Sequence, residues 1–233
     1  MTNMKDNQGS NNNFYWISVS DLMSGLMIVF LFISIAFMRY SQAEKDKIQN
    51  IAIAYQNTQI AIYNSLMDEF HDDLERWNVS INQDTLSFQF NAPEVLFNSG
   101  QSDINKYFQN ILSDFTPRYL AVLEQYKGSI EEVRIEGHTS SEWRYKTSED
   151  SAYFLNMELS QSRTRSVLHY MYSLPTLTDY QKQWIKDIFA AVGFSSSKII
   201  YTDGVEDKQR SRRVTFRIIT NSDKEIKKII TGT

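Results

Sequence analysis

The chain has 233 residues, of which 42% are apolar, and its 24 Lys and Arg against 28 Asp and Glu give a formal net charge of −4. This length suits one domain of ordinary size with additional short segments, and the acidic balance argues against nucleic-acid binding, which usually requires a basic face. Cysteine is absent, which excludes disulfides, thiolate metal sites and thiol nucleophiles within this sequence.

A long apolar run follows a short polar tail at the N-terminus. Residues 1–13 are rich in Asn and lack periodicity, so we expect a disordered tail. Residues 14–38, FYWISVSDLMSGLMIVFLFISIAFM, contain one charged side chain, Asp21. As a helix, the run reaches roughly 37 Å, enough to cross a hydrocarbon core of about 30 Å. No small-residue cleavage pattern follows it, so we predict an uncleaved transmembrane helix.

The carboxylate of Asp21 is unusual within this apolar run. A charge at such a depth costs on the order of 2.5–3.5 kcal/mol, so it indicates a function by default. Ser18, Ser24 and Gly25 lie on the same helix face at i−3, i+3 and i+4, a narrow seam that suits close helix packing. We expect Asp21 to carry an ion, with these three residues lining the ion path or packing beside it. The alternative is that Asp21 only hydrogen-bonds a partner helix during assembly.

Residues 39–76 are expected to form an amphipathic helix. Apolar residues recur there at helical spacing, namely Ile48, Ile51, Tyr55, Ile62, Leu66, Phe70 and Leu74. Such a stripe needs a covering partner, and self-association of two copies would supply it. The alternative is that the stripe packs on the chain's own folded domain.

The pattern changes at Trp77, and we predict one folded domain over residues 77–221. Alternating residues around Asn82 predict a hairpin over 79–90. Ser102 is expected to cap a helix that runs toward Tyr126 and is interrupted at Pro117. The expected elements that follow are a strand at 130–139, helices at 152–172 and 178–192, and strands at 198–204 and 212–220. This order predicts an α+β fold, a mixed sheet with helices on one face, followed by a tail at 222–233.

Three segments of this domain resemble the OmpA-like peptidoglycan-binding family. They are VLFNSGQSDI, then IEGHTSSEW followed by NMELSQSRTRSV, and finally SRRVTFRI. The resemblance covers residues 79–219, and its middle segment is the specific one because it fixes several residue types at set spacings. It implies a periplasmic domain that binds peptidoglycan.

The resemblance also assigns the residues of a binding site. Arg163 stands where the family's arginine grips the carboxylate of the stem-peptide diamino acid. Thr139, Asn156, Leu159 and Ser160 match the signature, and Leu155 directly precedes it. Ser140 stands where the family usually has an Asp that holds the ligand's amino group, and Ser211 replaces the usual Asn. Because a hydroxyl brings no charge, Glu142 is the candidate for the missing carboxylate.

The residue spacing supports this assignment independently of the family. Asn156, Leu159 and Arg163 lie at i, i+3 and i+7, so one helix face would present an amide, an apolar contact and a guanidinium. A guanidinium can hold a carboxylate in a bidentate clamp. His138 stands close to two serines, but no nucleophile elbow, metal-ligand spacing or phosphate loop accompanies it. We therefore expect neither catalysis nor a metal site, and we interpret His138 as a structural residue.

The complete layout, a span with one Asp, a periplasmic helix and an OmpA-like domain, resembles the MotB family of ion-driven stator subunits. Within it, FYWISVSDLMSGLMIVFLF is more similar to the ZorB family, the MotB-like components of Zorya anti-phage defence systems. This resemblance implies a homodimer within a ring of MotA-like (ZorA-like) subunits and a proton or sodium ion carried at Asp21, without a cofactor. It places the protein in the bacterial inner membrane with its N-terminus cytoplasmic, although Arg39, Lys45 and Lys47 after the span weakly favour the opposite orientation. A flagellar-type stator subunit, an immobile wall tether and a TolR- or ExbD-like energy transducer are the alternatives.

Overall fold

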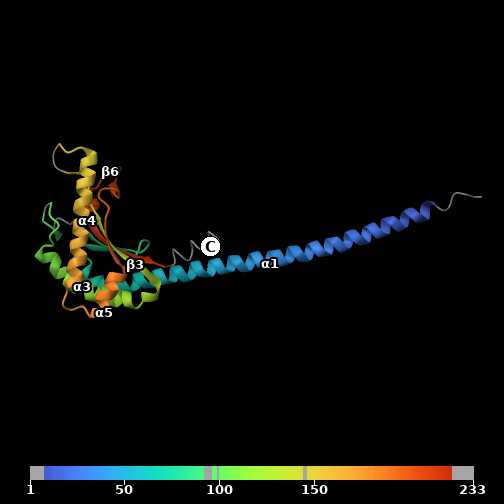
Figure 1. Ribbon diagram of the computed structural model, residues 1–233, viewed down its shortest axis with the longest axis horizontal. Helices are drawn as coiled ribbons and strands as arrows, with labels where there is room; N and C mark the ends of the chain where they lie inside the picture. The colour runs from blue at the N-terminus through green and yellow to red at the C-terminus, as the bar shows by residue number, and fades with distance from the viewer. Residues whose placement is uncertain (1–7, 92–95, 99, 144–145, 222–233) are drawn as a thin grey trace, which may run out of the picture. The chain divides into compact units, whose positions relative to one another are not determined.

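The computed structural model describes residues 8–91, 96–98, 100–143 and 146–221. It separates into two compact units, Met1–Ile53 and Ala54–Thr233. One helix of 63 residues, α1 (Gln8–Phe70), begins in the first unit and ends in the second (Figure 1). Residues 8–13 were expected to be disordered but belong to this helix, whereas residues 1–7 lie outside the described part.

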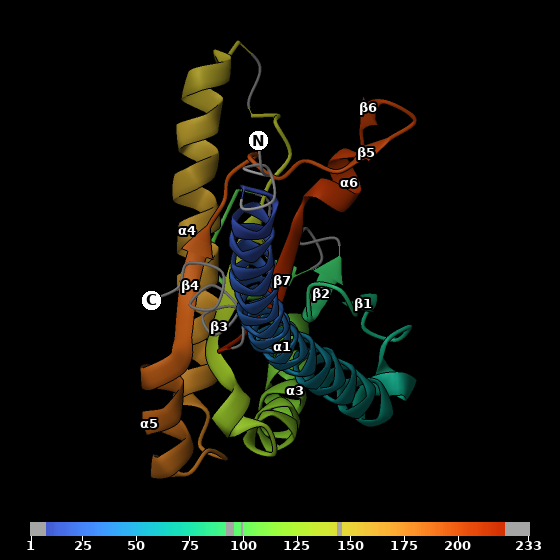
Figure 2. The same cartoon turned by 90° about the vertical axis from the view of Figure 1, so that its right-hand side faces the viewer.

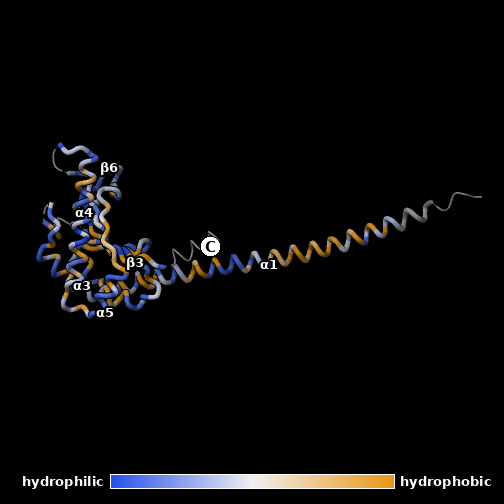
Figure 3. Tube along the Cα trace, viewed as in Figure 1, coloured by the Kyte–Doolittle hydropathy of each residue, from blue (hydrophilic) through white to orange (hydrophobic). Residues whose placement is uncertain are grey.

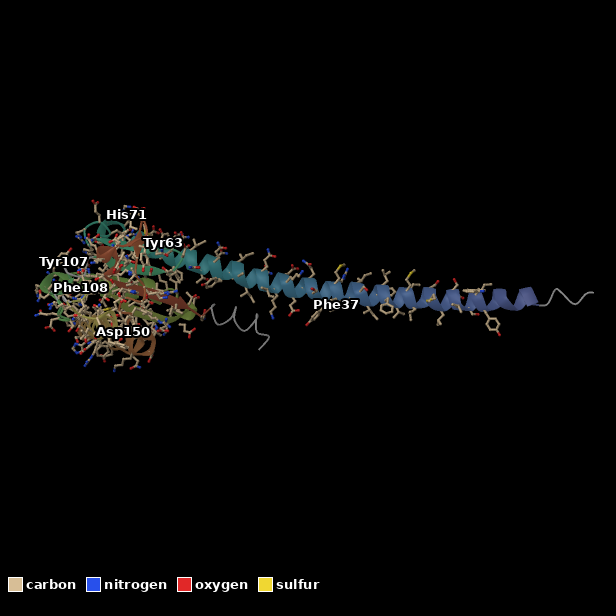
Figure 4. The ribbon with its side chains drawn as sticks, turned by 90° about the horizontal axis from the view of Figure 1, so that it is seen from above. Phe37, Tyr63, His71, Tyr107, Phe108 and Asp150 are labelled. Atoms are coloured by element: carbon tan, nitrogen blue, oxygen red, sulfur yellow. The ribbon has the colours of Figure 1, made fainter. Side chains whose placement is uncertain are left out.

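The apolar part of α1 is long enough to cross a membrane. Its most apolar window has a mean hydropathy of 2.2 and is not buried by any other part of the described chain (Figure 3). Side chains stand out from it on all sides, including Phe37, which is 72% exposed (Figure 4). Length and composition therefore agree with the expected transmembrane segment.

The second unit is built on a five-stranded mixed sheet, as the sequence predicted. Its order is β1 (Val79–Asn82), β2 (Ser87–Asn91), β7 (Arg213–Thr220), β3 (Ile130–His138) and β4 (Phe189–Gly193) (Figure 2). The β1–β2 hairpin forms at the expected place. Only β3 and β4 pair in parallel, and the remaining neighbours are antiparallel.

Aromatic side chains fill the core between the sheet and the helices. Phe88, Phe90 and Phe216 from the sheet are fully buried. They meet α3 (Lys106–Glu124), whose Phe115 stacks on Tyr119 with ring centroids 4.7 Å apart. The large buried area of such rings makes them the main contributors to the stability of this unit.

The C-terminal part of α1 belongs to this core. Ile62, Leu66 and Phe70 are all 0% exposed, so this half of the predicted stripe packs on the chain's own domain and cannot join two copies. That corrects the expectation of self-association for these positions, because the aromatic core already covers them. In the upper half of the stripe, by contrast, Ile48 is 43% exposed, and Ile51 and Tyr55 are partly exposed.

A charged cluster fixes the end of α1 to α3. Arg118 donates to the carboxylate of Glu69 at 2.6 Å and to that of Asp73 at 2.7 Å. Its guanidinium also lies 4.7 Å from the ring centroid of Phe70. Burial by itself lowers the pKa of Arg118, but the bonds to Glu69 and Asp73 outweigh this effect and raise it. Arg118 is thus a charged clamp between two helices.

Three local predictions were wrong. The cap of α3 is Asn105, which accepts from the backbone N–H of Phe108, and not Ser102. Pro117 lies inside α3 without ending it; burial of the neighbouring aromatic residues offsets the missing backbone bond. The predicted strand at 198–204 reduces to β5 (Tyr201–Thr202), which pairs with β6 (Val205–Glu206) outside the main sheet.

The predicted helix at 178–192 ends early. Residues Asp179–Ile188 form α5, which starts with a capping box between Thr178 and Gln181. The next five residues form β4 instead, in parallel register from Val133↔Phe189 to Gly137↔Gly193. A neighbouring strand therefore decides the conformation of this segment, which its own sequence does not specify. The helix predicted at 152–172 is confirmed as α4 (Glu149–Ser173).

Candidate functional site

Two glycines bring α4 into direct contact with the ends of β3 and β4. A Cβ atom at Gly137 would lie 2.7 Å from the carbonyl oxygen of Ser160, and one at Gly193 would lie 2.5 Å from the backbone nitrogen of Gln161. The Gln161 side chain accepts from Gly193 N–H at 2.8 Å and donates to Ala191 O at 3.1 Å, so it covers the free edge of β4. The signature segment of α4 is thereby held in a fixed position on the sheet.

Asn156 fixes the loop that follows β3. Its side-chain amide donates to the carbonyl oxygens of Ser140 at 3.3 Å and Glu142 at 3.2 Å, and the residue is only 3% exposed. The backbone N–H of Thr139 donates to the carbonyl oxygen of Ser195 at 2.9 Å. The structure therefore brings together the predicted residues Asn156, Thr139 and Ser140. It shows that Asn156 shapes the loop through the backbone.

The carboxylate at this loop comes from an unexpected residue. Glu206 on β6 accepts from the backbone N–H of Ser141 at 2.8 Å and from its hydroxyl at 2.5 Å. Glu142, the candidate for the carboxylate that would hold the ligand's amino group, forms an ion pair with Lys208 at 3.0 Å, and its side chain is 59% exposed. Sequence reasoning missed Glu206 because it lies 65 residues from Ser141 and belongs to none of the motifs.

Arg163 lies on the same side of α4 as Asn156, two turns further along. It is 8% exposed, its Nε donates to the carbonyl oxygen of Gln101 at 3.0 Å, and its guanidinium lies 4.9 Å from the ring centroid of Phe97. The Phe-containing loop of the resemblance thus supports the arginine directly. Residues 92–95 and 99 of this loop lie outside the described part.

The predicted apolar contacts are more accessible than the polar ones. Leu155 is 38% exposed, and Leu159 is half-buried. Thr139 is buried, and within the described residues its hydroxyl has no hydrogen-bond partner. A small zwitterionic ligand requires an arginine guanidinium fixed in position, hydroxyl groups, a nearby carboxylate and apolar contacts. The residues of this site supply these groups.

The predicted ion site lies on α1, in the other unit. Ser18, Asp21, Ser24 and Gly25 are exposed. The hydroxyl of Ser24 donates to the carbonyl oxygen of Ser20 at 2.8 Å, and a Cβ atom at Gly25 would meet nothing within 4 Å. Among the described residues, none covers this face, so it is open to a neighbouring helix from another chain.

Ser211, at the position where the resemblance expects Asn, has a structural role. It is fully buried, and its hydroxyl accepts from the backbone N–H of Ile200 at 2.9 Å. This bond joins α6 (Lys208–Ser211) to the segment before β5. Ser211 therefore helps to hold in place the β5–β6 segment, which contains Glu206.

A helix long and apolar enough to span a membrane, followed by a mixed-sheet domain with an OmpA-like signature, defines a MotB-like membrane protein. The chain is 52% identical over 220 residues to a Zorya protein ZorB from Escherichia coli strain ATCC 8739, covering 94% of this chain and 93% of the relative. A second Zorya protein ZorB, from E. coli O139:H28 strain E24377A, is 25% identical over 223 residues, covering 88% and 79%. The chain belongs to the ZorB family. No family model matches it.

Solved structures that resemble part of this chain include a cell wall anchor and MotB or MotB-like proteins. A putative MotB-like protein from Desulfovibrio vulgaris is 18% identical, with a TM-score of 0.49 and coverage of 73% of this chain and 94% of that one. The cell wall anchor of the T6SS from Pseudomonas aeruginosa is 20% identical, with a TM-score of 0.46 and coverage of 66% and 96%. The periplasmic domain of Helicobacter pylori MotB is 17% identical, with a TM-score of 0.41 and coverage of 63% and 84%.

Proposed function

We propose that this protein is a peptidoglycan-anchored, ion-conducting subunit of a MotA–MotB-like membrane complex that acts in anti-phage defence. The observation that carries the proposal is Asp21, the one charged side chain in the apolar run, on an uncovered helix face within a ZorB family member. An uncompensated carboxylate in such a segment indicates an ion pathway or a proton relay. The high identity to a Zorya protein favours defence over flagellar motility.

The proposed orientation follows from the folded domain. Peptidoglycan lies outside the inner membrane, so a domain that binds it must be periplasmic and the short N-terminal segment cytoplasmic. Wall binding would use Arg163, whose Nε donates to the carbonyl oxygen of Gln101 and whose guanidinium lies against the ring of Phe97. An anchored domain would keep the chain stationary while its partners move.

In the proposed mechanism, two copies of α1 lie side by side inside a ring of MotA-like subunits. Ser18, Ser24 and Gly25 allow close approach of a ring helix to Asp21, because small side chains permit tight packing. A proton or a sodium ion enters, neutralises the carboxylate, and leaves on the other side. The alternation of Asp21 between charged and neutral forms drives the ring relative to the wall.

An immobile tether would need the wall-binding domain but not Asp21, so Asp21→Asn separates the two functions. Asparagine keeps the size and hydrogen-bonding capacity of Asp21 but cannot ionise. In cells that carry the complete system, we expect Asp21→Asn to assemble with the ring subunits at normal yield and to lose protection in a phage plaque assay. Glu44→Gln, an exposed position on α1 beyond the apolar run, is the control and should keep protection. Full protection by Asp21→Asn would reject the ion-carrier role.

A further inference from the structure

The face of the sheet opposite the aromatic core carries a block of polar side chains. Strand residues alternate between the two faces of a sheet, and those between the core positions of β2, β7 and β3 are all polar. The strand register places them in three rows across the sheet: Asn91–Arg213–His138, Gln89–Thr215–Glu136 and Ser87–Arg217–Arg134. These three strands are direct neighbours (Figure 2). Thr215 is at the centre of the block.

Part of this face forms the floor of a cleft of about 270 Å³. The segment after β4, with Phe194, Lys198 and Ile200, and the β1–β2 turn form its walls. The floor is well covered, because Thr215 is 4% exposed and Glu136 is 6% exposed. The cleft is therefore partly enclosed and has polar side chains at its floor.

Three polar atoms on the floor lack a hydrogen-bond partner within the described part of the chain. They are Glu136 Oε1, His138 Nδ1 and Thr215 Oγ1. His138 is fixed on its other side, since its ring stacks on Phe194 at 5.3 Å and its Nε2 lies 3.5 Å from Glu136 Oε2. Buried polar side-chain atoms nearly always have a partner, and the described residues supply none for these three.

The charges that line the cleft determine the charge of the ligand that it favours. Three cationic side chains, Lys198, Arg213 and Arg217, line it against one carboxylate, Glu136. Arg213 is held in place because its Nη1 donates to the carbonyl oxygens of Lys198 at 3.2 Å and Ser211 at 3.0 Å. Burial lowers the pKa of His138, so this ring adds no charge near neutral pH. The net positive charge favours an anion.

We propose that this cleft binds a small carboxylate that carries a neighbouring N–H or O–H donor. The carboxylate lies toward Arg213 and Lys198, and the donor lies toward the carboxylate of Glu136. A phosphate dianion fits less well, because its second charge would lie against the buried carboxylate of Glu136. None of Thr139, Ser140, Asn156 and Arg163 lines the cleft, so this proposal is independent of the wall-binding function.

Ligand binding can be measured directly by NMR on the full-length protein in detergent micelles, with isotope-labelled histidine residues. The sequence has three histidines, and only His138 lines the cleft, so His71 and His169 serve as internal controls in the NMR spectrum. The probes are N-acetylglycine, which has both a carboxylate and an adjacent N–H, acetate without the donor, and N-acetylglycinamide without the charge. Inorganic phosphate is the fourth probe. His71→Gln and His169→Gln variants assign the signals.

We expect N-acetylglycine to shift the His138 signal in a saturable way, with an apparent affinity at least about tenfold above those of the other three probes. Thr215→Val removes a floor hydroxyl at nearly constant shape, and Lys198→Gln removes an exposed charge at the rim. Each should weaken N-acetylglycine binding, whereas Arg210→Gln, an exposed cation outside the cleft, should not. Equal binding of acetate, or no saturable shift with any probe, would overturn the proposal and leave water as the occupant.

Discussion

Glu206 holds Ser141 through both of its carboxylate oxygens, one on the backbone N–H at 2.8 Å and the other on the hydroxyl at 2.5 Å. Asn156 holds the same loop from the helix side through the carbonyl oxygens of Ser140 and Glu142. The part of the loop directly after β3, residues 139–143, is therefore fixed by two side chains, one from β6 and one from α4. Its shape is preorganised, which lowers the cost of ordering when a ligand binds.

Replacement of Glu206 by Gln tests this fixation. In a glutamine amide, one of the two oxygens that accept from Ser141 is replaced by an NH₂ donor, and the charge that strengthens these bonds is lost. We expect hydrogen–deuterium exchange of residues 139–143 in Glu206→Gln to increase by about tenfold, equivalent to roughly 1.4 kcal/mol of local stability. Exchange in the central strand β7 should not change. Glu158→Gln, at an exposed position of α4, is the matched control.

Arg163 and Arg165 provide a matched pair on one helix. Arg163 is buried against Phe97 and Gln101, whereas Arg165 is exposed on another side of α4. Lysine keeps the positive charge but lacks the planar fork and the Nε–H. In co-sedimentation of the detergent-solubilised chain with purified peptidoglycan, we expect Arg163→Lys to lose about tenfold or more in affinity. Arg165→Lys should sediment like the wild type, and equal behaviour of the two variants would reject Arg163 as the clamp.

Elements with local signals were predictable, and those decided by distant partners were not. The β1–β2 hairpin and α4 have patterns that are complete within their own residues, so the sequence predicted both. Residues Phe189–Gly193 follow a helix without a break, and only pairing with β3 makes them a strand. The continuation of α3 through Pro117 likewise depends on the burial of Phe115 and Tyr119, which periodicity does not weigh against a proline.

The same distinction explains which residues of the candidate site could be predicted from the sequence. Asn156 and Arg163 were identified by the family signature and by their spacing on one helix, and both signals are local in the sequence. The partners that fix them, Ser140 and Gln101, come from other segments of the chain. Glu206 belongs to a two-residue strand, which is too short for any periodic signal, and only the fold brings it to Ser141.

Single cysteines in this cysteine-free sequence test which part of the α1 stripe joins two copies. Ile51 is partly exposed and Ile62 is fully buried in the domain core. We therefore expect Ile51→Cys to form a disulfide-linked dimer in oxidised membranes and Ile62→Cys to form none. Gln56→Cys, exposed on another side of α1, should cross-link weakly. Efficient cross-linking at Gln56 instead of Ile51 would show that the upper stripe faces a different partner.

The last prediction concerns the dependence of stability on pH. Burial lowers the pKa of His138, Arg213 and Lys198 add to this effect, and Glu136 opposes it. Because the pKa in the folded state is below the unfolded value of about 6.5, the unfolded chain binds more protons over this range. The free energy of unfolding therefore decreases as the pH falls below about 6.5, until the folded-state pKa is passed. Above that range the contribution of His138 is fully present.

We expect the thermal midpoint of the detergent-solubilised wild type to drop further between pH 7.5 and pH 5 than that of His138→Gln, which cannot be protonated. Each unit of pKa difference corresponds to about 1.4 kcal/mol, or roughly 3–6 °C for a chain of this size. His169→Gln, at an exposed position, controls for the loss of any histidine and should retain the wild-type dependence. Since the carboxylates are unchanged in all three proteins, their contribution cancels in the comparison. Parallel pH profiles for the wild type and His138→Gln would mean that the buried ring is not what couples the stability of this domain to protons.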